Sequence, residues 1–206
     1  MKRFSILATL ICLLFSGCFS LPTITTSSTP SSTGQASTPH WGTRTKTSGC
    51  TVNGALQDTA CTPGDIFPDA TKDQICESGY SSSVRNVSTS EKNQVYAEYG
   101  IMHHTTGAYE VDHLVSLELG GSNDISNLWP EAANPKPGFH EKDKVENYLH
   151  DQVCSGAISL QQAQIEIATN WLDVYNQMQS GSINSGSISS GSLYSFSNSD
   201  LVLSCS

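Results

Sequence analysis

Positively charged residues are scarce in this sequence. It holds 10 Lys and Arg against 19 Asp and Glu, which gives a formal net charge of −9 at pH 7. A broad basic face that binds nucleic acid by neutralising phosphates needs many more cations. The composition therefore argues against that class of binder. Any contact with phosphate must rely on a few local cations or on a bound metal.

Closely spaced cysteine pairs and long apolar runs are also missing. None of the seven cysteines forms a C-x-x-C motif, which argues against a zinc ribbon or a thioredoxin-like redox site. The apolar run from Ile6 to Phe15 is too short to anchor stably across a membrane. Because Lys2 and Arg3 precede it and small residues lead to Cys18, residues 1–20 predict a signal peptide. Cys18 is the expected lipidation site of a lipoprotein signal, and ordinary cleavage nearby is the alternative.

Export to an oxidising compartment turns scattered cysteines into disulfides. Four cysteines lie in the region that we expect to fold, and four cysteines allow three pairings. We favour Cys50–Cys61, which closes a local loop, and Cys76–Cys154, which ties the N-terminal part to a late helix. Cys205 is left without an assigned role.

Two segments contain too few large apolar residues to fold by themselves. Residues 21–48 are rich in Ser, Thr and Pro and predict a disordered linker, and residues 179–206 are rich in Ser and Gly and predict a disordered tail. Residues 201–203 could add a weak strand to that tail. The remaining 49–178 are long enough for one domain with a single core.

Capping residues and apolar periodicity predict an α+β domain that is mostly helical. Residues 50–82 carry Gly, Pro, Asp and Cys and predict loops with short turns. Helices are expected at 89–99, 141–154 and 160–177, and strands at 110–119 and 127–130, with a turn at 120–124 between the strands. Trp129 and Trp171 are expected in the core.

One stretch carries a recognisable motif. Asp112-His113-Leu114 stands on the first expected strand, Asn127-Leu128-Trp129-Pro130-Glu131 follows, and Lys142-Asp143-Lys144 begins a helix. These residues, in the order strand, turn, strand and helix, resemble the HNH (His-Me finger) endonucleases, and in particular a subgroup of exported bacterial HNH-domain proteins. The similarity extends from about residue 50 to residue 171. It implies a ββα-metal finger embedded in a small, disulfide-stapled domain.

The resemblance implies metal-dependent hydrolysis of phosphodiester bonds. His113 would be the general base, since a neutral imidazole can take a proton from water. Asp112 would bind the metal, and Asn127 would orient the His113 ring or hold the finger loop. Mg²⁺ or Mn²⁺ suits carboxylate and amide oxygens, and Zn²⁺ is the alternative if two histidines bind it.

The third metal ligand is open, because the segment between Asn127 and the helix is longer than in typical family members. His140, at the expected helix start, is the first choice and Asp143 comes next. Glu146 and Asn147 share the helical face of Asp143 and are further alternatives, and each of these residues could instead face solvent. The nearby lysines, Lys142 and Lys144, would bind substrate phosphate.

The expected activity is that of a monomeric endonuclease with little sequence specificity, acting on DNA and as an alternative on RNA, outside the cytoplasm. The sequence contains no helix-turn-helix, zinc-finger or basic-arm motif that would read bases. If Cys18 is lipidated, the protein is attached to a membrane. The competing hypotheses are a catalytically inactive, lipid-anchored surface or binding protein that keeps the HNH fold as a scaffold, and a toxin with an immunity partner.

Overall fold

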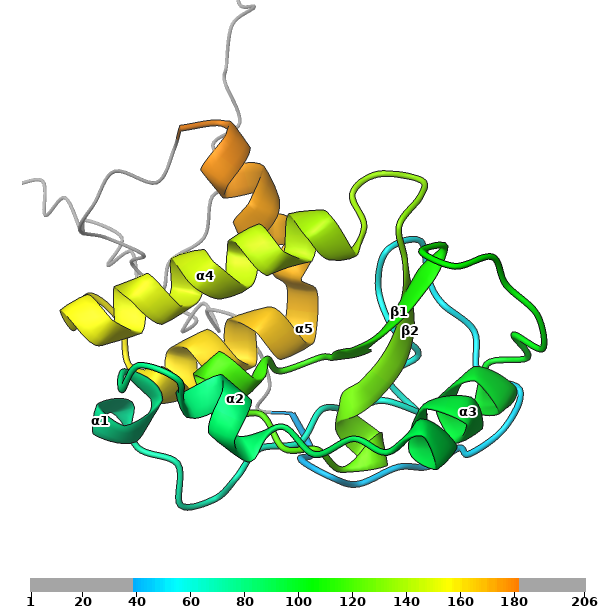
Figure 1. The fold of residues 1–206 in the computed structure, drawn as a ribbon. Coiled ribbons are helices and arrows are strands. Elements are labelled where there is room, and N and C mark those ends of the chain that lie inside the picture. The colour runs from blue at the N-terminus through cyan, green and yellow to red at the C-terminus, as the bar shows by residue number, and fades with distance from the viewer. Residues whose placement is uncertain (1–38, 182–206) are drawn as a thin grey trace, which may run out of the picture. The chain divides into compact units, whose positions relative to one another are not determined.

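The computed structural model describes residues 39–181, and its elements confirm the predicted α+β class. Short helices lead into a two-stranded sheet, and two long helices follow it (Figure 1). The helices are α1 (Lys72–Ile75), α2 (Tyr80–Val84), α3 (Thr89–Glu98), α4 (Phe139–Ser155) and α5 (Leu160–Gln179). The strands are β1 (Tyr109–His113) and β2 (Leu128–Ala132), with 3-10 turns at Leu117–Leu119 and Ile125–Asn127.

Side-chain caps set the helix starts close to where the sequence predicts them. Ser88 accepts the Glu91 N–H at the start of α3, and Ser159 accepts the Gln162 N–H at the start of α5. Helix α4 begins two residues earlier than expected. Its first turn is stabilised by Glu141, whose Oε2 accepts the Gly138 N–H at 3.0 Å.

The sheet is an antiparallel hairpin, but its first strand is shorter than predicted. In its register Asp112 lies opposite Trp129 and His113 lies opposite Leu128. The prediction of a strand over 110–119 is wrong beyond His113. There the Asn127 side chain takes both backbone groups of Val115, so a side chain replaces the partner strand. The chain then turns through Leu117–Leu119.

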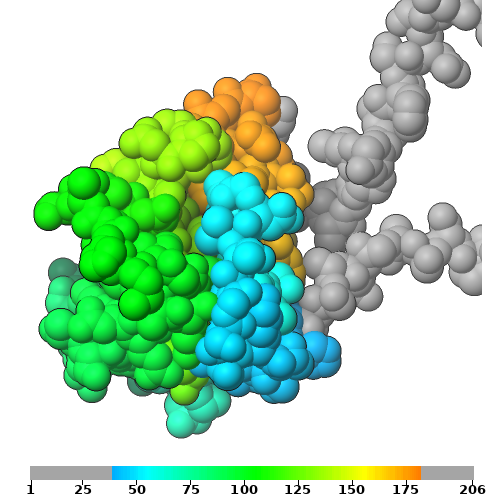
Figure 2. Space-filling view, turned by 90° about the vertical axis from the view of Figure 1, so that its right-hand side faces the viewer, coloured from blue at the N-terminus to red at the C-terminus, as the bar shows by residue number. Residues whose placement is uncertain are grey.

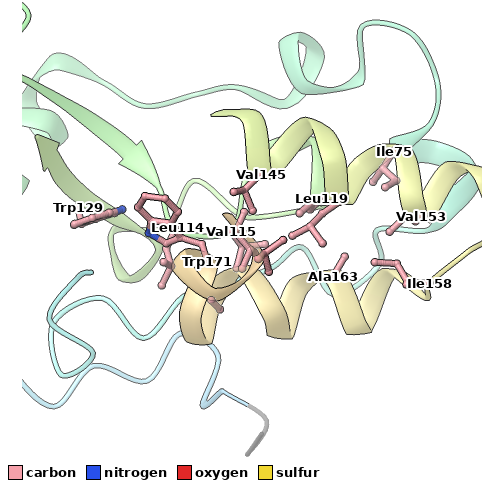
Figure 3. Close-up of a cluster of buried hydrophobic side chains, with 14 residues drawn as sticks. Ile75, Leu114, Val115, Leu119, Trp129, Val145, Val153, Ile158, Ala163 and Trp171 are labelled. Atoms are coloured by element: carbon pink, nitrogen blue, oxygen red, sulfur yellow. The ribbon is translucent and has the colours of Figure 1, made fainter. Parts of the chain in front are cut away.

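The core lies between α4 and α5 and extends to the hairpin. Both tryptophans predicted in the core, Trp129 and Trp171, are buried there. Figure 3 shows side chains from α4, α5 and the segment after β1 pointing toward one another. The predicted apolar stripe of α4 is confirmed in this core: Val145, Leu149 and Val153.

The folded part begins before residue 49, which corrects the predicted linker of 21–48. Trp41 packs on the core, and Gly64 provides the space, since a Cβ there would lie 3.1 Å from the Trp41 ring. Arg44 donates to the Cys61 carbonyl at 2.8 Å and pairs with Glu98. These contacts fix residues 39–48 to the domain, and Figure 2 shows the first described residues, in blue and cyan, on its surface.

Both predicted disulfides, Cys50–Cys61 and Cys76–Cys154, are confirmed. The predicted signal peptide, the lipidation site Cys18, the linker up to residue 38 and the tail from residue 182, with Cys205 and the weak strand at 201–203, lie outside the described residues. Within 39–181, no helix combines the length and the apolar character needed to cross a membrane.

Candidate active site

His113 is the last residue of β1, and one turn residue holds its ring. His113 is 3% exposed, and its Nε2 lies 3.2 Å from Asn123 Oδ1. The Asn123 amide is itself oriented. Its Nδ2 donates to the Val84 carbonyl at 2.8 Å, and its Oδ1 accepts the Asn86 N–H at 3.0 Å. Asn123 therefore presents a hydrogen-bond acceptor to the imidazole.

This acceptor selects one neutral tautomer of His113. Nε2 carries the proton that is donated to Asn123, which leaves the lone pair on Nδ1. Among residues 39–181 no group hydrogen-bonds to Nδ1 of His113. Burial lowers the pKa of His113 to about 4, with help from the cations Arg85 and Lys142 and against the opposing charge of Asp112. The imidazole is therefore neutral at pH 7 and can accept a proton at Nδ1.

A fully buried lysine lies directly behind His113. Lys142 Nζ, from the first turns of α4, lies 2.7 Å from Asp112 Oδ2 and 2.8 Å from the His113 carbonyl oxygen. It also pairs with Glu146 one turn further along the helix. The Lys142 side chain has no exposed surface. One ammonium thus joins α4 to the end of β1 at the two residues that carry the motif.

The acidic groups around the Lys142 ammonium differ in the direction in which their pKa values are shifted. Burial would lower the pKa of Lys142, but Asp112, Glu146 and Glu131 raise it well above its ordinary value. Burial would likewise raise the pKa of Asp112, but the Lys142 charge lowers it. Burial raises the pKa of Glu131 far above its ordinary value, and the Asp112 charge adds to that effect. The Lys142 charge therefore favours the ionised form of Asp112, whereas burial disfavours the ionised form of Glu131.

The Asn127 side chain is buried, and it hydrogen-bonds to the loop between β1 and β2 and not to the ring of His113. Its Oδ1 accepts the Val115 N–H at 2.9 Å, and its Nδ2 donates to the carbonyls of Val115 and Ser122 at 2.9 and 2.8 Å. Of the two predicted roles, the loop-holding one is observed. The ring-orienting role belongs to Asn123.

The predicted metal ligands are not brought together as a closed site. His140 and Asp143 lie on the exposed side of α4, with side chains 64% and 57% exposed, and His140 Nδ1 is 3.8 Å from Asp143 Oδ2. Asp143 does lie within electrostatic range of Asp112. Partial burial and, next, the Asp112 charge raise the pKa of Asp143. Within residues 39–181, however, His140, Asp143 and Asp112 do not form a group with ligand atoms mutually within 4.8 Å.

The two lysines predicted to bind phosphate occupy different environments. Lys144 is exposed, with Nζ 3.6 Å from Glu141 Oε1. Lys142 cannot contact a substrate in this arrangement, because its ammonium is sealed from solvent and already holds Asp112, Glu146 and the His113 carbonyl. This placement corrects the predicted role of Lys142.

The remaining candidates for the third ligand have other partners. Glu146 pairs with Lys142, and Asn147 Nδ2 donates to the Asp143 carbonyl. One group in the described part of the chain has the spacing of a metal site, formed by Cys76, His150 and Cys154. The two cysteines form a disulfide, so their sulfurs are not free to bind a metal.

Two residues at the site were not anticipated from the sequence. Asn123 lies in the predicted turn, where an Asn usually serves its own backbone. Arg85, at the end of α2, is exposed, and its charge acts on both His113 and Glu110. Neither belongs to a helical or strand pattern, so only the folded chain brings them to His113.

The site therefore consists of a neutral buried imidazole with a free Nδ1, a carboxylate bonded to a buried ammonium, and an exposed guanidinium nearby. Such an imidazole can act as a general base, and the guanidinium can attract an anionic substrate. Comparisons of the chain with protein-family models, with curated proteins and with solved structures find no match.

Proposed function

We propose that the protein is a phosphodiester hydrolase, an endonuclease of the HNH type, with His113 as its general base. The observation that carries the proposal is the state of that ring. It is neutral, its Nε2–H is donated to an oriented Asn123, and its Nδ1 lone pair is free. The ring follows Asp112 at the end of a hairpin, and α4 packs behind it through Lys142. This order supports a ββα finger and membership of the HNH family.

In the proposed reaction Nδ1 takes a proton from the attacking water. The imidazolium that forms carries its positive charge next to Asp112, whose charge raises the pKa of His113. It also keeps its Nε2–H bond to Asn123 Oδ1. Asp112 is held by Lys142, so the charge that favours the imidazolium is fixed in place before reaction.

Arg85 is the proposed contact for the scissile phosphate. It is an exposed cation near a buried histidine, in a chain with a net charge of −9. A guanidinium can bind two phosphate oxygens at once. Exposed Lys144 is a second candidate contact. With so few cations the protein should bind nucleic acid weakly and without reading its sequence.

A hard divalent cation remains part of the proposal. Glu110, Asp112 and Asp143 lie within electrostatic range of one another, and the pKa values of Glu110 and Asp143 are raised first by burial and then by the neighbouring carboxylates. Carboxylate oxygens suit Mg²⁺ or Mn²⁺, and Mg²⁺ keeps much of its water and binds few protein groups. Asp112 and Asp143 would hold it, partly through water. When bound, such a cation neutralises the charge that develops on the phosphate.

The disulfides favour an exported protein, since such bonds persist in oxidising compartments. We therefore propose action on DNA, with RNA as an alternative substrate, outside the cytoplasm. Attachment to a membrane through Cys18 is part of the same proposal.

The test is a plasmid-nicking assay on the mature chain with Mg²⁺, Mn²⁺ or Zn²⁺, and with a chelator. We expect nicking that the chelator abolishes, and a loss on the order of a hundredfold or more in His113→Ala. His103→Ala is the matched control, because His103 is an exposed loop histidine. Equal nicking by wild type and His113→Ala would remove His113 from the mechanism.

One observation favours a second candidate, an inactive scaffold used for binding at the cell surface. Lys142 already neutralises Asp112, and His140 and Asp143 do not complete a closed metal site with it. Absence of nicking with every metal, in a chain that is folded by circular dichroism, would favour this reading.

A further inference from the structure

A second chemically distinct group lies at the far end of α4. The sulfurs of Cys76 and Cys154 and a ring nitrogen of His150 lie within 4.8 Å of one another. His150 and Cys154 are one helical turn apart on α4, and Cys76 caps α1. The sequence predicts the Cys76–Cys154 pair but not that His150 lies beside it.

His150 is held beside the sulfurs by its own contacts. Its Nε2 lies 3.5 Å from Cys154 Sγ and 3.0 Å from the carbonyl oxygen of Ile75, the residue before Cys76. The ring therefore already bridges α1 and α4. The same nitrogen faces the sulfur and the carbonyl, so Nε2 carries a proton that it donates to the Ile75 oxygen, and this proton must move to Nδ1 before Nε2 can bind a metal.

We propose that these three residues form a zinc site when the disulfide is reduced. A dithiol reductant supplies two electrons and two protons, becomes a disulfide itself, and leaves the thiols of Cys76 and Cys154. Zn²⁺ then displaces both thiol protons and binds two thiolates and one imidazole nitrogen, with water as the fourth ligand. The reaction needs no other partner.

Apart from the release of the Ile75 hydrogen bond, the ligand atoms need to move little. Zinc holds thiolates at about 2.3 Å and imidazole nitrogens at about 2.0–2.1 Å, so ligand atoms of a tetrahedral site lie roughly 3–4 Å apart. Three ligand atoms within 4.8 Å of one another already approach that spacing once the sulfur–sulfur bond opens. Either state ties α1 to α4. The cluster thus supplies one covalent staple under oxidising conditions and one metal staple under reducing conditions.

This inference does not depend on the proposed nuclease activity, since Cys76, His150 and Cys154 take no part in it. The test uses the full chain with its five other cysteines replaced by serine: Cys12, Cys18, Cys50, Cys61 and Cys205. The protein is reduced with a phosphine, which does not chelate zinc as dithiols do. Co²⁺ is then titrated as a spectroscopic probe, followed by displacement with Zn²⁺.

We expect one Co²⁺ per reduced chain, with thiolate charge-transfer absorption, and no binding by the oxidised chain. His150→Ala should weaken binding by roughly tenfold or more, and Cys76→Ser should abolish it. No binding by the reduced chain, or unchanged affinity in His150→Ala, would overturn the proposal. If the serine background does not fold, the same difference is measured between reduced wild type and Cys76→Ser, where one metal equivalent should be lost.

Discussion

Lys142 Nζ lies 2.7 Å from Asp112 Oδ2, in a place with no exposed surface on the lysine side chain. The same ammonium is shielded from solvent, and it donates a hydrogen bond to the carbonyl oxygen of His113 at 2.8 Å. This single cation fixes the carboxylate and the backbone of the two residues on which the proposed chemistry depends.

Replacing Lys142 should therefore damage the fold as well as the site. Lys142→Met keeps most of the side-chain volume but leaves Asp112, whose side chain is 17% exposed, without its counter-charge. We expect a loss of about 3–5 kcal/mol in the free energy of unfolding, the usual result of removing one partner of a buried ion pair. Urea unfolding measures it. Lys144→Met is the matched control, since Lys144 is exposed on the same helix; an equal loss in the two variants would contradict the assigned role.

Asn123 should act as a positioning residue for His113. Asn123→Ala removes the acceptor for Nε2–H and the donor to the Val84 carbonyl. Without them both ring tautomers become available, and we expect kcat for cleavage to fall by roughly tenfold or more while KM changes little. Asn123→Asp keeps the acceptor and should retain more activity than Asn123→Ala. A change in KM alone would assign Asn123 to substrate binding instead.

Arg85 should affect binding rather than chemistry or stability. Arg85→Ala removes an exposed cation near His113, so KM should rise several-fold, more at low salt than at high salt, because salt screens the lost attraction. Thermal unfolding should be unchanged, as for most exposed substitutions. The control is Lys92→Ala, which removes an exposed cation from α3. If both variants behave alike, the contact with substrate is not local to Arg85.

The low pKa of His113 makes stability depend on pH. The folded pKa of about 4 lies below the ordinary value of 6.5, so the folded state binds the proton more weakly than the unfolded state does. The contribution of neutral His113 is complete above pH 6.5 and is lost as pH falls toward 4, by about 3 kcal/mol in all. His113→Gln has no imidazole, so its stability lacks this pH-dependent contribution. The difference in unfolding free energy between the two proteins should therefore shrink from pH 7 to pH 4, and a constant difference would contradict the assignment.

The sequence predicts the parts of this account that follow from local pattern. The alternation around Asp112 and His113 predicts β1, and the capping serines Ser88 and Ser159 predict the starts of α3 and α5. Both disulfide pairs were also predicted, although two other pairings were open.

The features of the site that the sequence does not predict depend on contacts between segments that are distant in the chain. A lysine on a helix is ordinarily solvated, and only the approach of Asp112 makes burial of Lys142 favourable. The strand ends at His113 because a side chain, Asn127, takes the backbone groups of Val115. Asn123 faces His113 because α2 supplies the Val84 carbonyl that orients it. None of these partners can be read from spacing.

The most direct test of the central claim is chemical rescue of the proposed base. His113→Gly removes the imidazole and leaves the volume of its ring for added free imidazole. If His113 accepts the proton, added imidazole should restore cleavage by His113→Gly by roughly tenfold or more, with a pH dependence that follows the titration of imidazole. It should leave wild type unchanged. Cleavage by His113→Gly that matches wild type without imidazole, or that imidazole does not raise, would contradict the assignment of His113 as the general base.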